Sequence, residues 1–370
     1  MSMRLTHRIA IVVSFSLSAA MAQTATSQIV KAANTFLSTL DQKQRHGVLF
    51  AFDDEQQRAR WSNFPTGFVP RGGISLKEMT PAQRSAAMAL VSSALSPRGL
   101  EKVQQIMEGD EVLKHTEGNG PPFGGGPPPG AGGPPNGGAG RGRPPFANGG
   151  DGQMFGKDLY YISILGMPSE KNPWMLQFGG HHLALNITID GERGILTPTL
   201  TGAQPALYKL NGKTVRPLGP ESDKAMALLN ALDESQRKQA ILNYRVADLV
   251  LGPGQDGKII QPEGLKASAM SDKQRVMLLD VISEWTGIIH ESAAAARLAE
   301  IKTDIDKTWF AWSGATTVAP GKNIVAYYRI QGPHLVIEYA PQGLGGDPSM
   351  HVHTMYRDPT NDYGRKPGAK

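Results

Sequence analysis

The chain has 370 residues, of which 40% are hydrophobic and 19% are charged, so it is long enough to bury a large core as one domain or two. Its net charge is only +5, which excludes the strongly basic composition typical of nucleic-acid-binding proteins. The absence of cysteine excludes disulfides and thiol chemistry.

Residues 1–22 have the pattern of a secretory signal peptide. Arg4 and Arg8 flank the start of an apolar segment, and small residues end at Ala22, near which cleavage is expected. The apolar segment is shorter than the roughly 20 residues that cross a bilayer, so no stable membrane insertion is expected. Removal of the two arginines lowers the net charge from +5 to +3, and the mature protein is expected to be periplasmic or secreted.

A Gly/Pro-rich tract divides the first half of the mature chain. Residues 117–152 consist mostly of Gly, Pro and Asn, and they cannot bury enough apolar surface to fold, so we predict a disordered insertion. It separates a helical part, 23–116, from a β-hairpin part, 153–218. The second half is predicted to repeat this order, with a helical part at 219–307 and a β-hairpin with a histidine-containing C-terminal segment at 308–370.

A short sequence motif recurs four times, and each copy has the pattern of a capping box at a helix start. An Asp, Thr or Ser cap is followed three residues later by Gln, whose side chain can bond back to the backbone N–H of the cap. The pairs are Asp41 and Gln44, Thr80 and Gln83, Asp233 and Gln236, and Ser271 and Gln274. Because the spacing from the first cap to the second nearly equals the spacing from the third to the fourth, the pattern indicates an internal duplication.

The duplication continues into the predicted hairpins. The segment "QFGGHHLALNI" aligns with "RIQGPHLVIEY", which places His182 opposite His334 and Asn186 opposite Glu338. We predict one strand over Trp174–Ile189 and its counterpart over Asn323–Ala340. The expected fold class is α+β, with two pseudo-equivalent halves that each contain helices followed by an antiparallel β-hairpin.

Five of the nine histidines lie in three short segments. Strand alternation predicts that His182 faces the polar side in the first half and that His334 does so in the second. His351 and His353 form an H-x-H pair that can chelate one ion, although a purely structural pair is an equal alternative. We expect His182 and His334, one from each half, to bind a divalent metal such as zinc, copper or iron together with His351 or His353, with Glu338 as either a carboxylate ligand or the general base. His181 lies on the apolar side and is expected to pack inward or to support its neighbour.

Four segments resemble a known family. "FPTGFVPRGGISLKEMTPAQR", "FGGHHLALN", "YYRIQGPHLVIEY" and "HVHTMYRDPTNDYG" are similar to the hallmark segments of the domain of unknown function 3500 family of exported bacterial proteins. The resemblance covers nearly the whole mature chain apart from the Gly/Pro-rich tract. It supports the boundaries given above and implies no assigned activity.

The first functional hypothesis is a metal-dependent exported enzyme that acts on a small-molecule or anionic substrate. Hydrolysis is the first choice because the sequence lacks a nucleotide-cofactor fingerprint, and an oxygenase or oxidase is the runner-up. The candidate catalytic residues are Glu338 and His181, and the candidate substrate-binding residues are Arg71, Arg329, Arg357, Asn186 and Trp174.

Two other classes remain open at this point. The same histidines could perform metal-free acid/base or phosphoryl chemistry. Alternatively, the protein could be a non-catalytic periplasmic binding protein that captures a metal or an anionic ligand between its halves. The substrate, the metal and the oligomeric state are left open.

Overall fold

The computed structural model describes residues 25–116, 154–343 and 346–365, so the expected signal peptide and the Gly/Pro-rich insertion lie outside the described residues. The helices are residues 25–38, α2 (Gln42–Val48), α3 (Glu55–Arg58), α4 (Pro81–Ala94), α5 (Pro97–Thr116), α6 (Gly219–Ala231), α7 (Glu234–Ala240), α8 (Asp272–Thr286) and α9 (Glu291–Thr303). The strands are β1 (Leu49–Phe50), β2 (Ile74–Ser75), β3 (Tyr161–Leu165), β4 (Trp174–Gly180), β5 (Leu183–Asp190), β6 (Arg193–Ile195), β7 (Thr199–Ala203), β8 (Tyr208–Leu210), β9 (Lys213–Val215), β10 (Leu265–Lys266), β11 (Trp309–Ser313), β12 (Tyr327–Gly332), β13 (Leu335–Pro341) and β14 (Val352–Arg357).

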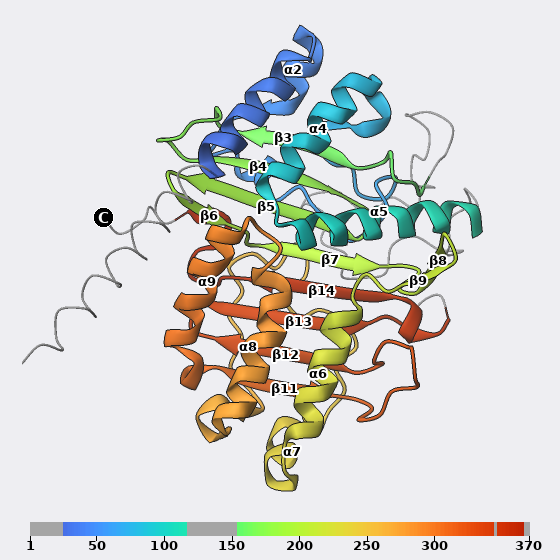
Figure 1. Ribbon diagram of the computed structural model, residues 1–370, viewed down its shortest axis with the longest axis vertical. Helices are drawn as coiled ribbons and strands as arrows, with labels where there is room; N and C mark the ends of the chain where they lie inside the picture. The colour runs from blue at the N-terminus through green and yellow to red at the C-terminus, as the bar shows by residue number, and fades with distance from the viewer. Residues whose placement is uncertain (1–24, 117–153, 344–345, 366–370) are drawn as a thin grey trace, which may run out of the picture.

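One mixed α+β arrangement results, built on a 12-stranded sheet. The strand order is β1-β3-β4-β5-β7-β14-β13-β12-β11-β10, with β2 paired to β3 and β6 paired to β5. Figure 1 shows the part of this order from β3 to β11. The pair β7–β14 is antiparallel and joins the strands of the N-terminal part to those of the C-terminal part. At its centre Thr201 lies opposite Thr354, and the two side-chain hydroxyls are 2.7 Å apart.

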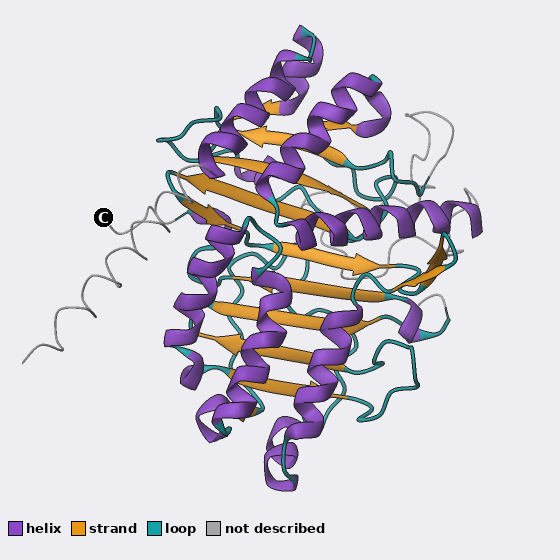
Figure 2. Ribbon diagram, in the orientation of Figure 1, coloured by secondary structure: helices purple, strands orange, loops and turns teal. Residues whose placement is uncertain are grey.

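Apart from the short helix α3, the helices cover one face of the sheet, and loops cover the other (Figures 1 and 2). Helix α3 lies on the loop face. On the helix face, alternate strand residues such as Leu185 and Ile337 belong to two large buried apolar clusters, because side chains alternate between the faces of a strand. On the loop face, Leu200 and Met355 pack with Trp61 in a smaller buried cluster at the centre. The sheet is therefore buried on both sides near the β7–β14 pair.

All four predicted capping boxes are confirmed, with both reciprocal hydrogen bonds in each. The capping glutamines also bond to one another in pairs, Gln44 with Gln83 and Gln236 with Gln274. The arginine after each glutamine donates to a carbonyl eight residues earlier: Arg45 to Leu37, Arg84 to Leu76, Arg237 to Leu229 and Arg275 to Ala267. The recurring motif therefore stabilises a helix start, and it links two such starts in each part of the chain.

The predicted strand over Trp174–Ile189 has to be corrected, because it is two strands joined by a tight turn at His181 and His182. The run over Asn323–Ala340 likewise contains β12, a turn at Pro333 and His334, and β13. His182 adopts a positive φ of 59°, a conformation usually taken by Gly or Asn. Neither turn could be predicted from the sequence, because apolar residues flank it and neither of its two residues is a Gly, Asn or Asp.

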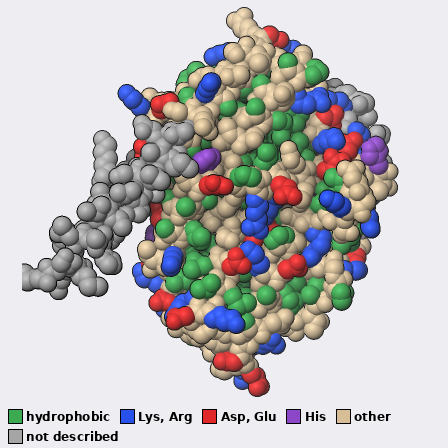
Figure 3. Space-filling model, in the orientation of Figure 1, with side chains coloured by type: hydrophobic (Ala, Val, Ile, Leu, Met, Phe, Trp, Pro, Cys, Tyr) green, Lys and Arg blue, Asp and Glu red, His purple; other side chains and the backbone are tan. Residues whose placement is uncertain are grey.

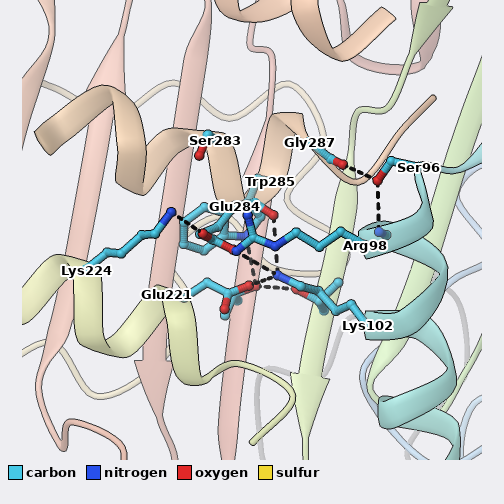
Figure 4. Close-up of polar contacts among 12 residues, drawn as sticks. Ser96, Arg98, Lys102, Glu221, Lys224, Ser283, Glu284, Trp285 and Gly287 are labelled. Carbon is cyan, nitrogen blue, oxygen red and sulfur yellow. Dashed lines mark hydrogen bonds and ion pairs between the residues drawn. The ribbon is translucent and has the colours of Figure 1, made fainter. Parts of the chain in front are cut away.

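A buried ionic cluster joins α5 to α6 and α8 (Figure 4). Lys102 of α5 donates to Glu221 of α6 and lies 3.7 Å from the carboxylate of Glu284 in α8. These three side chains are at most 5% exposed. Arg98 and Lys224 pair with Glu284 from the more exposed side. The cluster attaches the last helix before the insertion to the helices of the C-terminal part.

The surface seen in Figure 3 carries basic and acidic side chains that are interspersed over the helices. This distribution agrees with the small net charge of +5.

Candidate metal centre

The centre lies at the end of the sheet where β7 finishes and β5 and β14 begin. The pairs Leu183–Thr201 and Val352–Ala203 place the starts of β5 and β14 on either side of the end of β7. The turn that precedes β5 carries His182, and the entry to β14 carries His351 and His353. Three histidines from segments far apart in the sequence thereby reach one point.

The backbone around His182 allows this approach. The N–H of Gly202 donates to the carbonyl of His182 over 2.7 Å. A Cβ atom at Gly202 would lie 3.0 Å from Cδ2 of His182 and 2.9 Å from the carbonyl oxygen of Val352, which is too close for a side chain. Glycine at this position therefore leaves room for the His182 imidazole against β7.

The three Nε2 atoms form a nearly equilateral triangle. The separations are 3.0 Å between His182 and His351, 3.1 Å between His182 and His353, and 3.1 Å between His351 and His353. An ion held at about 2.05 Å requires nitrogen separations of about 2.9 Å for right-angle coordination and about 3.3 Å for tetrahedral coordination. The observed values lie between these two limits, so the group could hold a metal ion.

The charge state of His182 also suits a metal ligand. Burial, together with the neighbouring imidazoles His181, His351 and His353, lowers the pKa of His182 well below its ordinary value. His182 is therefore neutral, as metal binding requires. Three ring nitrogens that point at one another cannot all be satisfied by mutual hydrogen bonds, because each N–H···N contact needs one donor aimed at one acceptor. A shared cation would satisfy all three nitrogens at once.

Two polar side chains adjoin His353. Nδ1 of His353 lies 3.5 Å from a carboxylate oxygen of Asp248, and the side-chain amide nitrogen of Asn63 lies 3.4 Å from Nε2 of His353. Asn63 is 8% exposed, and its backbone carbonyl accepts from the backbone N–H of His182 over 3.3 Å. A carboxylate that contacts the ring nitrogen not used for metal binding commonly orients a histidine ligand.

The structure does not bring His334 to this group, so its predicted pairing with His182 has to be corrected. His334 is half exposed, with Nδ1 3.0 Å from the hydroxyl of Thr360 and Nε2 3.8 Å from Asp304. Since β5, β7, β14 and β13 are successively antiparallel, β5 and β13 run in opposite directions. The turns before these strands therefore lie at opposite ends of the sheet.

The two candidate catalytic residues are both buried and engaged. Glu338 accepts from the backbone N–H groups of Val250 and Leu251, each over 2.8 Å, and from the hydroxyl of Tyr327 over 2.7 Å. Burial raises the pKa of Glu338. His181 contacts Asp110, and its ring packs in a tilted arrangement against that of His182 with centroids 3.8 Å apart. His181 therefore adjoins the centre, whereas both Glu338 oxygens accept hydrogen bonds from other residues.

The candidate substrate-binding residues all have partners within the protein. Arg71 donates to backbone carbonyls, including that of Gly180 over 3.0 Å. Trp174 is fully buried and donates to the carbonyl of Ser169. The other three bond as follows: Arg329 to Glu263, Arg357 to Asp256 and Asp362, and Asn186 to Gln177 and Pro198.

Three neighbours of the centre were missed by reasoning from the sequence, namely Asn63, Asp110 and Asp248. Asp110 lies on a helix with several other acidic residues, and Asn63 and Asp248 lie in irregular segments. No local motif marks any of the three, because only the packing of distant segments brings them to the histidines.

The fold and the site define an α+β protein with a large, mostly antiparallel sheet and a group of three histidines that could hold a metal ion. The chain belongs to the DUF3500 family, described as a protein of unknown function, whose match covers residues 22–365. Neither the curated proteins nor the solved structures contain a match to this chain. Among the helices of the described residues, none combines the length and apolar character needed to cross a membrane.

Proposed function

We propose that this chain is an exported protein that binds one divalent metal ion through the Nε2 atoms of His182, His351 and His353 and uses it to hydrolyse a small-molecule or anionic substrate. The observation that carries the proposal is the triangle of Nε2 atoms with sides of 3.0 to 3.1 Å. A set of three imidazoles suits zinc, copper or iron.

A divalent ion held by these three histidines would supply Lewis-acid chemistry, which makes water nucleophilic near neutral pH. The side chains of the chain supply the surroundings. Asn63 offers an N–H donor 3.4 Å from Nε2 of His353, where it can orient an oxygen of the substrate. Asp248 can hold the His353 ring through Nδ1 and keep Nε2 directed at the ion.

Two alternatives use the same centre. An oxygenase or oxidase is compatible with a set of three imidazoles, because iron and copper bind imidazole well. A non-catalytic binding protein is supported by a separate observation: Arg329 and Arg357 are engaged in ion pairs, and both oxygens of Glu338 accept hydrogen bonds within the protein. These candidate substrate-binding and catalytic residues therefore have their partners within the protein, so none of them is assigned to a substrate in the binding-protein alternative.

We also propose that the chain arose by internal duplication. Four features support this: the paired capping boxes, the same pairing order in β2-β3-β4-β5 and β10-β11-β12-β13, the antiparallel β7–β14 pair at the centre of the sheet, and two turns with histidine at the second position. In this interpretation His182 and His334 are equivalent in origin, and only His182 lies at the end of the sheet where β14 begins and brings its two histidines.

The proposal is tested by the metal content of the mature protein, residues 23–370. Elemental analysis is done on the wild type, on His182→Ala, and on His334→Ala as a matched control from the corresponding turn. We expect about one equivalent of zinc, copper or iron in the wild type and in the control, and loss of that metal in His182→Ala. A metal-free wild type that also binds none of these ions on addition would refute the proposal.

A second experiment separates the enzyme from the binding protein. The metal-loaded protein is screened against carboxyl esters, phosphoesters and amides, and separately for consumption of dioxygen. Metal-dependent hydrolysis that His182→Ala abolishes supports the first choice. Dioxygen consumption with the same dependence supports the oxidase alternative, and a loaded protein that is inactive in both screens supports a binding function.

A further inference from the structure

We propose that Asp110 is a positioning residue of the metal centre, which acts on the ligand His182 through the His181 ring. This inference rests on the proposed function, since it assumes that His182 binds the metal. Asp110 comes from α5, a helix that carries none of the three ligands.

Hydrogen bonds hold the backbone of the turn that carries His182, from Gly180 to His182. The carbonyl of Gly180 accepts from Arg71 over 3.0 Å, and the carbonyl of His181 accepts from the hydroxyl of Tyr160 over 2.9 Å. His182 bonds through its backbone to Asn63 and Gly202. A residue with a φ of 59° needs such support, because this conformation is unfavourable for residues other than glycine. The turn is therefore held in one conformation before any metal binds.

Asp110 fixes the one side chain of the turn that is not a ligand. One carboxylate oxygen lies 2.6 Å from Nδ1 of His181, and the other accepts from the backbone N–H of Gly156 over 3.1 Å. Both Asp110 and His181 are less than 5% exposed. The contact joins the His181 ring to a carboxylate that is itself held by α5 and by Gly156, so it fixes the orientation of the ring.

The fixed His181 ring in turn supports the ligand. The ring centroids of His181 and His182 are 3.8 Å apart with an interplanar angle of 34°, and Phe155 lies 5.1 Å from the His181 ring. A ligand ring packed against a rigid neighbour loses less conformational entropy when it binds a metal. Asp110 therefore contributes to metal affinity without touching the ion.

The helix that carries Asp110 is itself anchored. Lys102 lies eight residues earlier on α5 and enters the buried cluster with Glu221 and Glu284 (Figure 4). Eight residues correspond to about 12 Å along a helix, so Asp110 lies roughly two turns from a strong attachment to α6 and α8. The position of Asp110 is thus set by contacts that do not involve the metal centre.

Asp110→Asn tests the inference with little change in shape. An Asn side chain has only one acceptor oxygen, so if that oxygen keeps the N–H of Gly156, the amide –NH2 faces Nδ1 of His181, which then loses a carboxylate partner. The matched control is Asp304→Asn, because Asp304 lies 3.8 Å from His334 at the corresponding turn, away from the centre. Cobalt(II) is the probe: its dissociation constant is measured by competition with a chelator, and its visible absorption reports the coordination geometry.

We expect Asp110→Asn to weaken cobalt binding about tenfold or more and to shift the absorption bands at saturation, with Asp304→Asn equal to the wild type. An affinity and a spectrum equal to those of the wild type would overturn the inference. If circular dichroism shows that Asp110→Asn does not fold, Tyr160→Phe is used instead, because it removes the hydroxyl that holds the His181 carbonyl. Unchanged affinity in that folded variant overturns the support ascribed to His181. A wild type that binds neither cobalt nor zinc overturns the proposed function as well, so the two failures are distinguishable.

Discussion

His182 and His334 each occupy the second position of a tight turn between two antiparallel strands, yet they lie at opposite ends of the same sheet. His182 is 3% exposed and meets His351 and His353, whereas the side chain of His334 is 53% exposed and meets Thr360. Two residues with the same local setting therefore have different surroundings, and this difference makes His334 the natural control for the experiments below.

Metal binding is expected to stabilise the folded protein. Because the three histidines converge only in the folded state, zinc at 100 times its dissociation constant should raise the free energy of unfolding by about 2.7 kcal/mol. The increase should disappear in His353→Ala and persist in His334→Ala, as measured by urea unfolding with and without zinc. An equal increase in His353→Ala would place the bound zinc at another site.

Gly202→Ala is expected to impair the centre. The added Cβ would lie 3.0 Å from Cδ2 of His182, so the imidazole must shift away from β7. We expect a lower zinc affinity, measured by competition with a chelator. Gly47→Ala is the control, since its Cβ would meet only Ile74 at an ordinary contact distance of 3.7 Å. Equal affinities in the two variants would show that His182 does not depend on this close approach.

Removal of Lys102 is expected to destabilise the fold strongly. In Lys102→Met the buried carboxylates of Glu221 and Glu284 lose a neutralising cation, which typically costs about 3–5 kcal/mol. Lys157→Met serves as the control, because Lys157 pairs with Glu108 over 3.0 Å with its side chain 54% exposed, and loss of an exposed pair typically costs less than about 1 kcal/mol.

Urea unfolding measures both variants. The double variant Lys102→Met with Glu221→Gln should recover part of the lost stability, because Glu221 then no longer leaves a buried negative charge without its cation. A Lys102→Met protein as stable as the Lys157→Met control would contradict the importance given to the cluster in Figure 4.

The exposed pair of Asp347 and Lys322 is expected to make a small contribution to acid stability. The hydrogen bond from Lys322, followed by those from Ser349, lowers the pKa of Asp347 to about 2. Because the folded-state pKa is depressed, the contribution is complete above the unfolded-state pKa of about 3.9 and is lost as the pH falls through about 2. Solvent screening limits its size to less than about 1 kcal/mol.

Asp347→Asn tests this pH dependence directly. Unfolding by urea at about pH 5 should show the variant to be slightly less stable than the wild type, and the difference should shrink towards about pH 2. A difference that grows on acidification would have the wrong sign and would contradict the depressed pKa. The result bears on the centre, because Asp347 caps the short helical turn Pro348–Met350 that leads into His351.

Much of the local structure could be predicted from the sequence. A capping box needs only a cap residue and a glutamine three positions later, so Asp41, Thr80, Asp233 and Ser271 were recognisable without any tertiary information. The turn at His181 and His182 could not be recognised in this way. Its positive φ is taken by His182, and it is supported by partners far away in the sequence, among them Tyr160 and Asn63.

The sequence by itself determined four of the helix starts, the membership of the DUF3500 family, and the small set of histidines among which the site had to be sought. Only the tertiary structure decided which histidines meet. Strand alternation places a side chain on a face of the sheet, but the direction of each strand decides at which end of the sheet it lies. Because β5 and β13 run in opposite directions, His182 reaches the start of β14, and His334 lies at the other end.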